Sequence, residues 1–211
     1  MLASAAYRAA MTSRVIELFF DIGSSYSYLA ATQMAGVEAR TGAAVRWRPF
    51  LLGAVFKASG NEMPARIPAK ARWMMGDMMM WSRHYAIPFR FPSRFPLNTL
   101  RTQRALAAVE HATGPAAVPA FALGLFHAYW ADDQDVSADP VIAAVASAAG
   151  LDGAAVVAAI DAPATKDLLR ATTDEAVRRG AFGAPSLFVG DTLFWGNDRL
   201  PLLEQHLAGP T

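Results

Sequence analysis

Segments typical of β-strands occur in two groups near the ends of the chain, and about 100 residues between the groups show no strand pattern. In the first group, residues 15–20 and 44–50 flank a helix expected over residues 26–40, which predicts a β-α-β unit with parallel strands. In the second group, residues 186–189 and 192–195 flank a Gly-Asp turn, which predicts a hairpin. A chain with this distribution can form one small sheet, and its middle segment must fold as helices.

The middle segment shows the apolar periodicity of helices joined by short connections. Asp139 and Asp152 are expected to cap two of these helices, and Gly180 is expected to end the helix before the hairpin. Asp198 is expected to cap a last helix that ends near Leu207. The helices of the middle segment are expected over residues 99–112, 116–130, 140–149 and 153–160, and residues 172–179 complete the helix that Gly180 ends.

This order of elements predicts an α/β, thioredoxin-like fold with a large all-helical domain inserted between its β-α-β half and its β-β-α half. We expect a thioredoxin-like domain of residues 15–60 and 166–211, a helical insertion domain of residues 61–165, and an N-terminal tail of residues 1–14. The tail has two Arg and no acid, which is typical of a weak transit peptide, of a ragged end, or of a start assigned upstream of Met11. It contains no apolar signal-peptide core, so we expect a cytoplasmic protein.

The 211 residues include no cysteine. This excludes disulfide scaffolds, cysteine zinc sites, iron–sulfur clusters and a cysteine nucleophile, so any sulfur chemistry must use a sulfur brought by a ligand. The four histidines lack metal-ligand spacing, and we expect no metal site. The net charge of +1 argues against bulk binding of polyanions, and no apolar stretch is long and uninterrupted enough to predict a membrane span.

The turn between the first strand and the first helix carries Ser24 and Ser27. In a thioredoxin-like fold these are the positions of the Cys-x-x-Cys thiols, at a helix N-terminus that stabilises a thiolate. A serine hydroxyl cannot exchange disulfides, but it can donate a hydrogen bond to a thiolate that another molecule supplies. The alternative is that Ser24 is an N-cap and nothing more.

Pro185 precedes the late strand in the sequence Gly183-Ala-Pro-Ser186. At this place a thioredoxin-like fold has a cis-proline that faces the active turn, and the residue before it offers its backbone to a peptide ligand. The alternative is an ordinary loop proline that enters an edge strand.

Residues 64–104 contain eight Lys or Arg and one acid, Asp77, interleaved with aromatic residues. Two interpretations remain open, a cavity for an aromatic anion and a solvated helix face. Nucleic-acid binding is not expected, because no recognition motif accompanies the charge. Five methionines at positions 74, 75, 78, 79 and 80 are expected to lie in the core or in a subunit interface.

The chain resembles the bacterial 2-hydroxychromene-2-carboxylate isomerases and the related kappa-class glutathione transferases, within the DsbA-like thioredoxin superfamily. The resemblance extends from Val15 to Leu207. The motifs that carry it are Phe20-Asp21, Ser24, Tyr26-Ser27-Tyr28-Leu29, Arg48-Pro49-Phe50, Ser59-Gly60-Asn61, Phe91-Pro92, Asn98-Thr99-Leu100, Gly180-Ala-Phe-Gly-Ala-Pro185 and Trp195-Gly-Asn-Asp-Arg199.

The resemblance implies a homodimer that binds glutathione. Ser24 matches the catalytic serine, which hydrogen-bonds the glutathione sulfur, although the family usually has Pro where this chain has Ser25. Ala184, before Pro185, matches the residue that pairs with the cysteinyl backbone. The γ-glutamyl group is implied to bind at Asn197 and Asp198.

The resemblance also implies binding positions outside the turn. Asn61 and Lys70 match positions near glutathione or the second substrate. Lys57, Phe95 and Asn98 are expected near the organic substrate, a small aromatic carboxylate.

The activity implied by the resemblance is isomerisation of 2-hydroxychromene-2-carboxylate and trans-o-hydroxybenzylidenepyruvate, or of a related aromatic-catabolic intermediate. It proceeds by reversible thiolate addition, bond rotation and elimination, with glutathione as a cofactor that is not consumed. The Trp-Gly-Asn-Asp-Arg motif favours the isomerases. The alternatives are a kappa-like transferase that conjugates an electrophile and a glutathione-binding module without catalysis.

Overall fold

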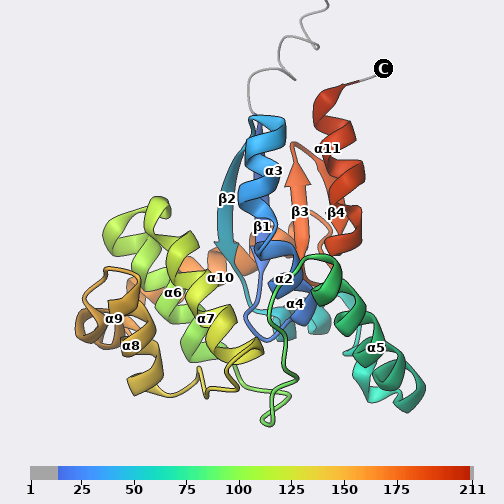
Figure 1. Ribbon diagram of the computed structural model, residues 1–211. Coiled ribbons are helices and arrows are strands. Elements are labelled where there is room, and N and C mark those ends of the chain that lie inside the picture. The colour runs from blue at the N-terminus through green and yellow to red at the C-terminus, as the bar shows by residue number, and fades with distance from the viewer. Residues whose placement is uncertain (1–13, 210–211) are drawn as a thin grey trace, which may run out of the picture.

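The computed structural model describes residues 14–209, so the expectations for the N-terminal tail fall almost entirely outside the described residues. Its strands are β1 (Val15–Phe20), β2 (Ala44–Pro49), β3 (Ser186–Val189) and β4 (Thr192–Trp195). They form one sheet in the order β2-β1-β3-β4 (Figure 1). β1 pairs in parallel with β2 and antiparallel with β3, and β3 and β4 form a hairpin. Both predicted strand groups are confirmed, and they join because β3 pairs with β1.

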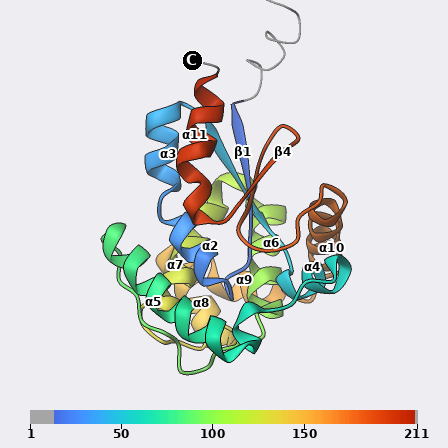
Figure 2. The ribbon, with the colours of Figure 1, turned by 90° about the vertical axis from the view of Figure 1, so that its right-hand side faces the viewer.

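The two faces of the sheet are covered by different helices. These are α3 (Met34–Thr41) and α11 (Leu200–Ala208) on one face and α4 (Leu52–Ser59) and α10 (Pro163–Arg178) on the other (Figure 2). Successive side chains of a strand point to opposite faces. Leu18 and Phe20 therefore enter a core shared with α3 and α11, whereas Phe19 packs against Phe50 and Phe188 on the α4 and α10 face.

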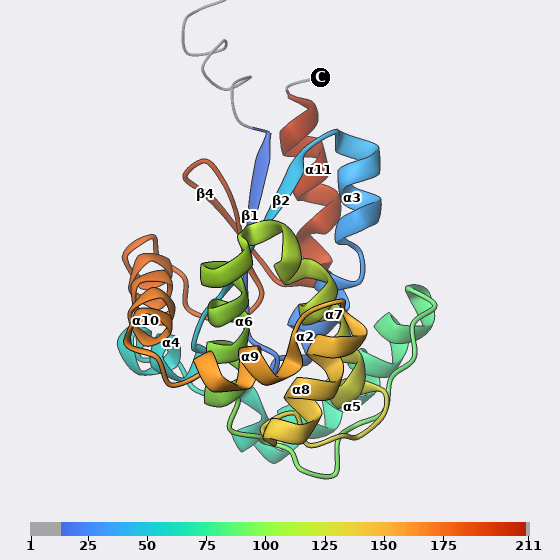
Figure 3. The same cartoon turned by 90° about the vertical axis from the view of Figure 1, so that its left-hand side faces the viewer.

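The helical segment lies beside one end of the sheet (Figure 3). It comprises α6 (Leu100–Thr113), a 3₁₀ turn η2 (Pro115–Ala117), α7 (Val118–Trp130), α8 (Asp139–Ala148) and α9 (Gly153–Ala159). Phe126 of α7 packs on Phe20 and Tyr28, so the helices and the sheet share one core. The chain thus has the thioredoxin-like fold with a helical insertion that the order of elements predicted.

One further helix, α5 (Pro68–His84), follows a 3₁₀ turn η1 (Pro64–Arg66) and projects from the opposite side of the molecule to α8 and α9 (Figure 1). The methionines expected in the core or an interface lie on it. Met78 is buried, but Met80 is 59% exposed, so the core interpretation is wrong for Met80. In the described part of the chain, no helix combines the length and the apolar character needed to cross a membrane.

The single helix expected over residues 26–40 is two helices, α2 (Ser25–Ala31) and α3. The break falls at Thr32, whose hydroxyl donates a hydrogen bond to the carbonyl of Leu29 at 2.8 Å. Threonine hydroxyls that bond the preceding turn bend helices. The bend lets α2 carry the serine turn while α3 packs along the sheet.

Of three predicted aspartate caps, one is confirmed. Asp152 accepts a hydrogen bond from the amide of Ala155 at 3.0 Å and caps α9. Asp139 is instead the first residue of α8, because its carboxylate pairs with Arg101 at 2.5 Å. Asp198 lies inside a 3₁₀ turn, η3 (Asn197–Arg199), and its side chain caps no helix.

Candidate active site

Ser24 stands at the N-cap of α2, immediately after the turn that ends β1. Its hydroxyl oxygen accepts a hydrogen bond from the amide of Ser27 at 3.1 Å and donates one to the carbonyl of Ala184 at 3.2 Å. The residue is only 8% exposed. The capping interpretation is therefore confirmed, and it leaves room for a second role, because the same hydroxyl reaches a segment 160 residues away in the sequence.

The segment that meets Ser24 contains a cis peptide bond between Ala184 and Pro185. The Pro185 carbonyl accepts a hydrogen bond from Gly196 at 3.1 Å, which joins the proline loop to the end of the hairpin. Gly183 is required beside it, since a Cβ there would lie 2.5 Å from Nε1 of Trp195. The expected cis-proline is confirmed, and it lies against the serine turn.

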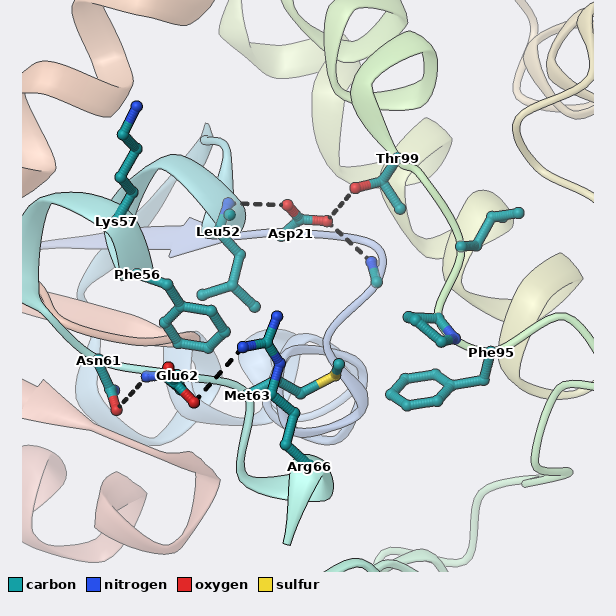
Figure 4. Close-up of a pocket in the computed structure, with 14 residues that line it drawn as sticks. Asp21, Leu52, Phe56, Lys57, Asn61, Glu62, Met63, Arg66, Phe95 and Thr99 are labelled. Carbon is teal, nitrogen blue, oxygen red and sulfur yellow. Dashed lines mark hydrogen bonds and ion pairs between the residues drawn. The ribbon is translucent and has the colours of Figure 1, made fainter.

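A cavity of about 420 Å³ opens next to this turn (Figure 4). One wall is the turn itself, a second is α4 with the loop that follows it, and the third is the segment before α6. The lining residues are Asp21, Gly23, Leu52, Gly53, Phe56, Lys57, Asn61, Glu62, Met63, Arg66, Phe95, Pro96, Leu97 and Thr99. Apolar and aromatic side chains dominate, which suits an organic ligand of moderate size.

Asp21 is buried where the three walls meet, and it is 3% exposed. Its Oδ1 accepts hydrogen bonds from the amide of Gly23 at 2.9 Å and the hydroxyl of Thr99 at 2.7 Å, and its Oδ2 accepts one from the amide of Leu52 at 2.9 Å. Burial raises the pKa of Asp21, and the three hydrogen bonds partly oppose that rise. Asp21 was expected only as part of the Phe20-Asp21 motif, without a role of its own. A carboxylate between an apolar strand and the serine turn was the available signal.

The aromatic wall of the cavity is anchored to the helical segment. Phe95 packs against Phe91 and Trp130, with ring centroids 5.0 and 6.1 Å apart. Trp130 is 1% exposed and donates a hydrogen bond from Nε1 to the carbonyl of Ile22 at 2.8 Å. The same indole therefore supports the cavity wall and holds the serine turn.

Two cations line the cavity, Lys57 and Arg66. In Figure 4 the ammonium of Lys57 points away from the open space, whereas the guanidinium of Arg66 lies over it, 3.5 Å from Glu62. Other arginines of the basic segment pair elsewhere, Arg90 with Asp133 and Arg101 with Asp161 among them. Of the Lys and Arg residues in 64–104, Arg66 lines the cavity, and most of the others face solvent or acidic partners.

Four other predicted site residues differ in how they lie. Asn61 lines the cavity and donates a hydrogen bond from Nδ2 to the carbonyl of Phe182 at 2.8 Å, which ties α4 to the proline loop. Lys70 is exposed on α5 and does not line the cavity. Asn98 also lies outside the lining, and its side chain accepts a hydrogen bond from the amide of Leu100. Asn197 is 2% exposed, and its side-chain amide donates to the hydroxyl of Tyr85 at 3.4 Å.

Two carboxylates lie near Tyr26, Asp77 on α5 and Asp198, which also pairs with Arg199 at 3.3 Å. Tyr26, on α2, donates a hydrogen bond to Asp77 at 2.8 Å. Burial raises the pKa of Tyr26, and the charges of Asp77 and Asp198 raise it further. Within residues 14–209, no group of three or more His, Asp or Glu side chains could hold a metal ion.

Comparison with known proteins agrees with this geometry. A family model described as a DsbA-like thioredoxin domain matches residues 15–208. A 2-hydroxychromene-2-carboxylate isomerase from Sphingobium xenophagum is 32% identical over 197 residues, covering 92% of this chain and 98% of the relative. Human glutathione S-transferase kappa 1 is 30% identical over 208 residues, covering 93% and 91%.

The solved structures point the same way. A 2-hydroxychromene-2-carboxylate isomerase superposes with a TM-score of 0.84 at 26% identity, over 92% of this chain and 94% of the other. Matches of this length include the sheet, the serine turn and the helical segment alike. The chain belongs to the DsbA-like thioredoxin family, in the group that contains 2-hydroxychromene-2-carboxylate isomerases and kappa-class glutathione transferases.

Proposed function

We propose that this protein is a glutathione-dependent isomerase of 2-hydroxychromene-2-carboxylate and trans-o-hydroxybenzylidenepyruvate, or of a related aromatic-catabolic intermediate. The observation that carries the proposal is the position of the Ser24 hydroxyl, 3.2 Å from the backbone of Ala184 and one residue beyond Gly23 of the aromatic cavity. A bound thiol and an organic substrate in the cavity can therefore meet at the turn. The relatives named as isomerases support the reaction class.

The groups around Ser24 fit glutathione in their chemistry. The Ser24 hydroxyl can turn from the Ala184 carbonyl to donate to a thiolate, which lowers the pKa of that thiol. The backbone of Ala184, beside the cis-proline, suits the peptide part of the tripeptide. Asp198 is half-exposed and, with Asp77, suits the γ-glutamyl ammonium, whereas the Asn197 amide is already engaged with Tyr85.

When bound, glutathione supplies a thiolate whose reversible addition turns a double bond into a single bond and so permits rotation. The residues of this chain do the rest. Phe56 and Phe95 hold the aromatic ring of a substrate between two walls, and they exclude water from it. The guanidinium of Arg66 is placed to hold the substrate carboxylate and to stabilise negative charge as it develops.

The cavity is small and lined on two sides by apolar surface, so its partner is a small aromatic carboxylate rather than a nucleic acid. We also propose a cytoplasmic homodimer. The exposed side chains of Ile67, Trp73 and Met80 near or on α5 support an interface between copies there, because apolar groups on a projecting helix favour burial.

A kappa-like glutathione transferase is the second candidate, favoured by the 30% identity to the human kappa enzyme. The two activities differ in the fate of glutathione, which the transferase consumes and the isomerase returns. We expect substoichiometric glutathione to bring 2-hydroxychromene-2-carboxylate to equilibrium with its isomer over many turnovers, as followed by absorbance. The thiol should be fully recovered at the end. Stoichiometric loss of thiol would favour the transferase. If the protein turns over neither the isomerase substrate nor an electrophile, but glutathione binds in calorimetry, a non-catalytic binding module is favoured.

Replacement of Arg66 by alanine is expected to raise KM for the carboxylate substrate about tenfold, because a hydrogen-bonded charge pair is lost. The effect on kcat is expected to be smaller, since the thiolate donor is untouched. Initial-rate kinetics at saturating glutathione measure both constants. Arg72→Ala is the matched control, because Arg72 is exposed on α5 and lies outside the cavity. Equal KM values for the two variants would show that another group holds the carboxylate.

A further inference from the structure

Asp21 is the one buried carboxylate among the residues that line the cavity, and the proposed reaction does not use it. Its three hydrogen bonds come from three different walls, the serine turn at Gly23, the start of α4 at Leu52 and the entry to α6 at Thr99. The last two partners are 31 and 78 residues away in the sequence. One side chain therefore fixes the relative position of the walls between which a substrate must lie.

The contact with Thr99 is close because residue 23 is glycine. A Cβ at Gly23 would lie 3.2 Å from Cγ2 of Thr99, which is tighter than ordinary packing. The absence of that atom lets α6 approach the turn until the Thr99 hydroxyl reaches Asp21. Glycine at position 23 therefore permits the hydrogen bond between Thr99 and Asp21.

A neighbouring amide continues the same connection. Gln103, one turn along α6 from Thr99, is fully buried and donates from Nε2 to the carbonyls of Phe20 and Phe50, each at 2.8 Å. Phe20 is the last residue of β1, and Phe50 directly follows β2. Because buried polar groups are costly unless they are paired, this set of hydrogen bonds has few alternative arrangements.

We propose that Asp21 is a positioning residue of the isomerase reaction, which through Thr99 and Gly23 sets the distance between the Ser24 turn and the substrate wall at Phe95. The inference rests on the proposed function. Asp21 itself is 3% exposed and both its oxygens are occupied, so it acts through the elements it joins and not by touching the substrate. Displacement of a reacting group by about 1 Å costs about a hundredfold in rate, so a small shift of α6 relative to the turn is sufficient to lower kcat.

The test removes one hydrogen bond to Asp21 without removing the carboxylate. Thr99→Val keeps the shape of the side chain and loses the donor, and Thr99→Ser restores the donor. The matched control is Thr102→Val on the same helix, because Thr102 is also buried and donates one hydrogen bond, to the carbonyl of Val136 at 2.6 Å, away from the cavity. Each variant is assayed for kcat with trans-o-hydroxybenzylidenepyruvate, for glutathione affinity by calorimetry and for melting temperature.

We expect Thr99→Val to lower kcat about tenfold or more while the Kd for glutathione changes less than about twofold, and Thr99→Ser to recover most of the loss. Thr102→Val should lower the melting temperature and leave kcat unchanged. If Thr99→Val behaves like Thr102→Val, or if its glutathione affinity falls as much as its kcat, the positioning role is overturned while the isomerase function stands. If the unaltered protein shows no turnover, the proposed function fails and the inference fails with it.

Discussion

Replacement of Ser24 by alanine is expected to lower kcat by about a hundredfold or more, while the chain stays folded. The hydroxyl is the side-chain donor at the turn that faces the Ala184 carbonyl, and its loss removes the hydrogen bond that would stabilise a bound thiolate. The same substitution removes the N-cap of α2, which costs about 1 kcal/mol of stability. Initial rates at saturating glutathione, and titration of the thiolate by its ultraviolet absorbance, measure the two parts of the effect.

Two variants at the same turn serve as controls for the Ser24 hydroxyl. Ser24→Thr retains a hydroxyl and a capping oxygen and should keep a substantial part of the activity. Ser25→Ala changes the adjacent buried serine, which is the first residue of α2, and should leave the thiol pKa unchanged. Turnover by Ser24→Ala equal to that of the unaltered protein would show that the thiolate is stabilised by another group.

Replacement of Trp130 by alanine is expected to have the largest effect on stability, a loss of about 3–5 kcal/mol in the free energy of unfolding. The indole is 1% exposed and packs against Phe89, Phe95 and Tyr129, so its removal leaves a large cavity. It also leaves the carbonyl of Ile22 without its donor. Denaturant unfolding monitored by circular dichroism gives the change.

The contributions of volume and hydrogen bond can be measured separately. Trp130→Phe keeps most of the aromatic packing and loses the bond to Ile22, so it should cost about 1–3 kcal/mol. Leu123→Ala, on the same helix but 36% exposed, should cost less than either. A Trp130→Ala protein as stable as Leu123→Ala would mean that the indole does not hold the helical segment to the turn.

Local patterns in the sequence were sufficient for most of the fold. The four strands, the hairpin and the helix ended by Gly180 follow from alternation, helical spacing and turn residues, which act over short stretches of chain. α4 was not predicted, because it is a short apolar helix and its position depends on packing against α10 and the sheet. The misplaced caps have a similar cause, since Asp139 has a tertiary partner, Arg101, that local spacing does not reveal.

The candidate site was predicted only in part, because its geometry depends on contacts between distant segments. Ser24 and Pro185 could be placed from the order of elements, and the structure brings them together. The number of basic residues in the sequence did not show which of them line the cavity. Lys57 and Arg66 both line the cavity, but only the structure shows that their side chains point in different directions (Figure 4).

The core shared by the sheet and the helical segment has a consequence for how ligands enter and leave. Phe126 touches the rings of both Phe20 and Tyr28, so a rigid rotation of α7 away from the sheet would expose three aromatic side chains to water. Such a motion is too costly to accompany every catalytic cycle. The segment at residues 86–99 is also held, because Phe89, Phe91 and Phe95 pack on Trp130. We therefore expect ligand exchange to use the loop at residues 60–63, which lines the cavity and has no buried residue. The helical insertion is then a fixed wall of the cavity, and ligands enter and leave beside it.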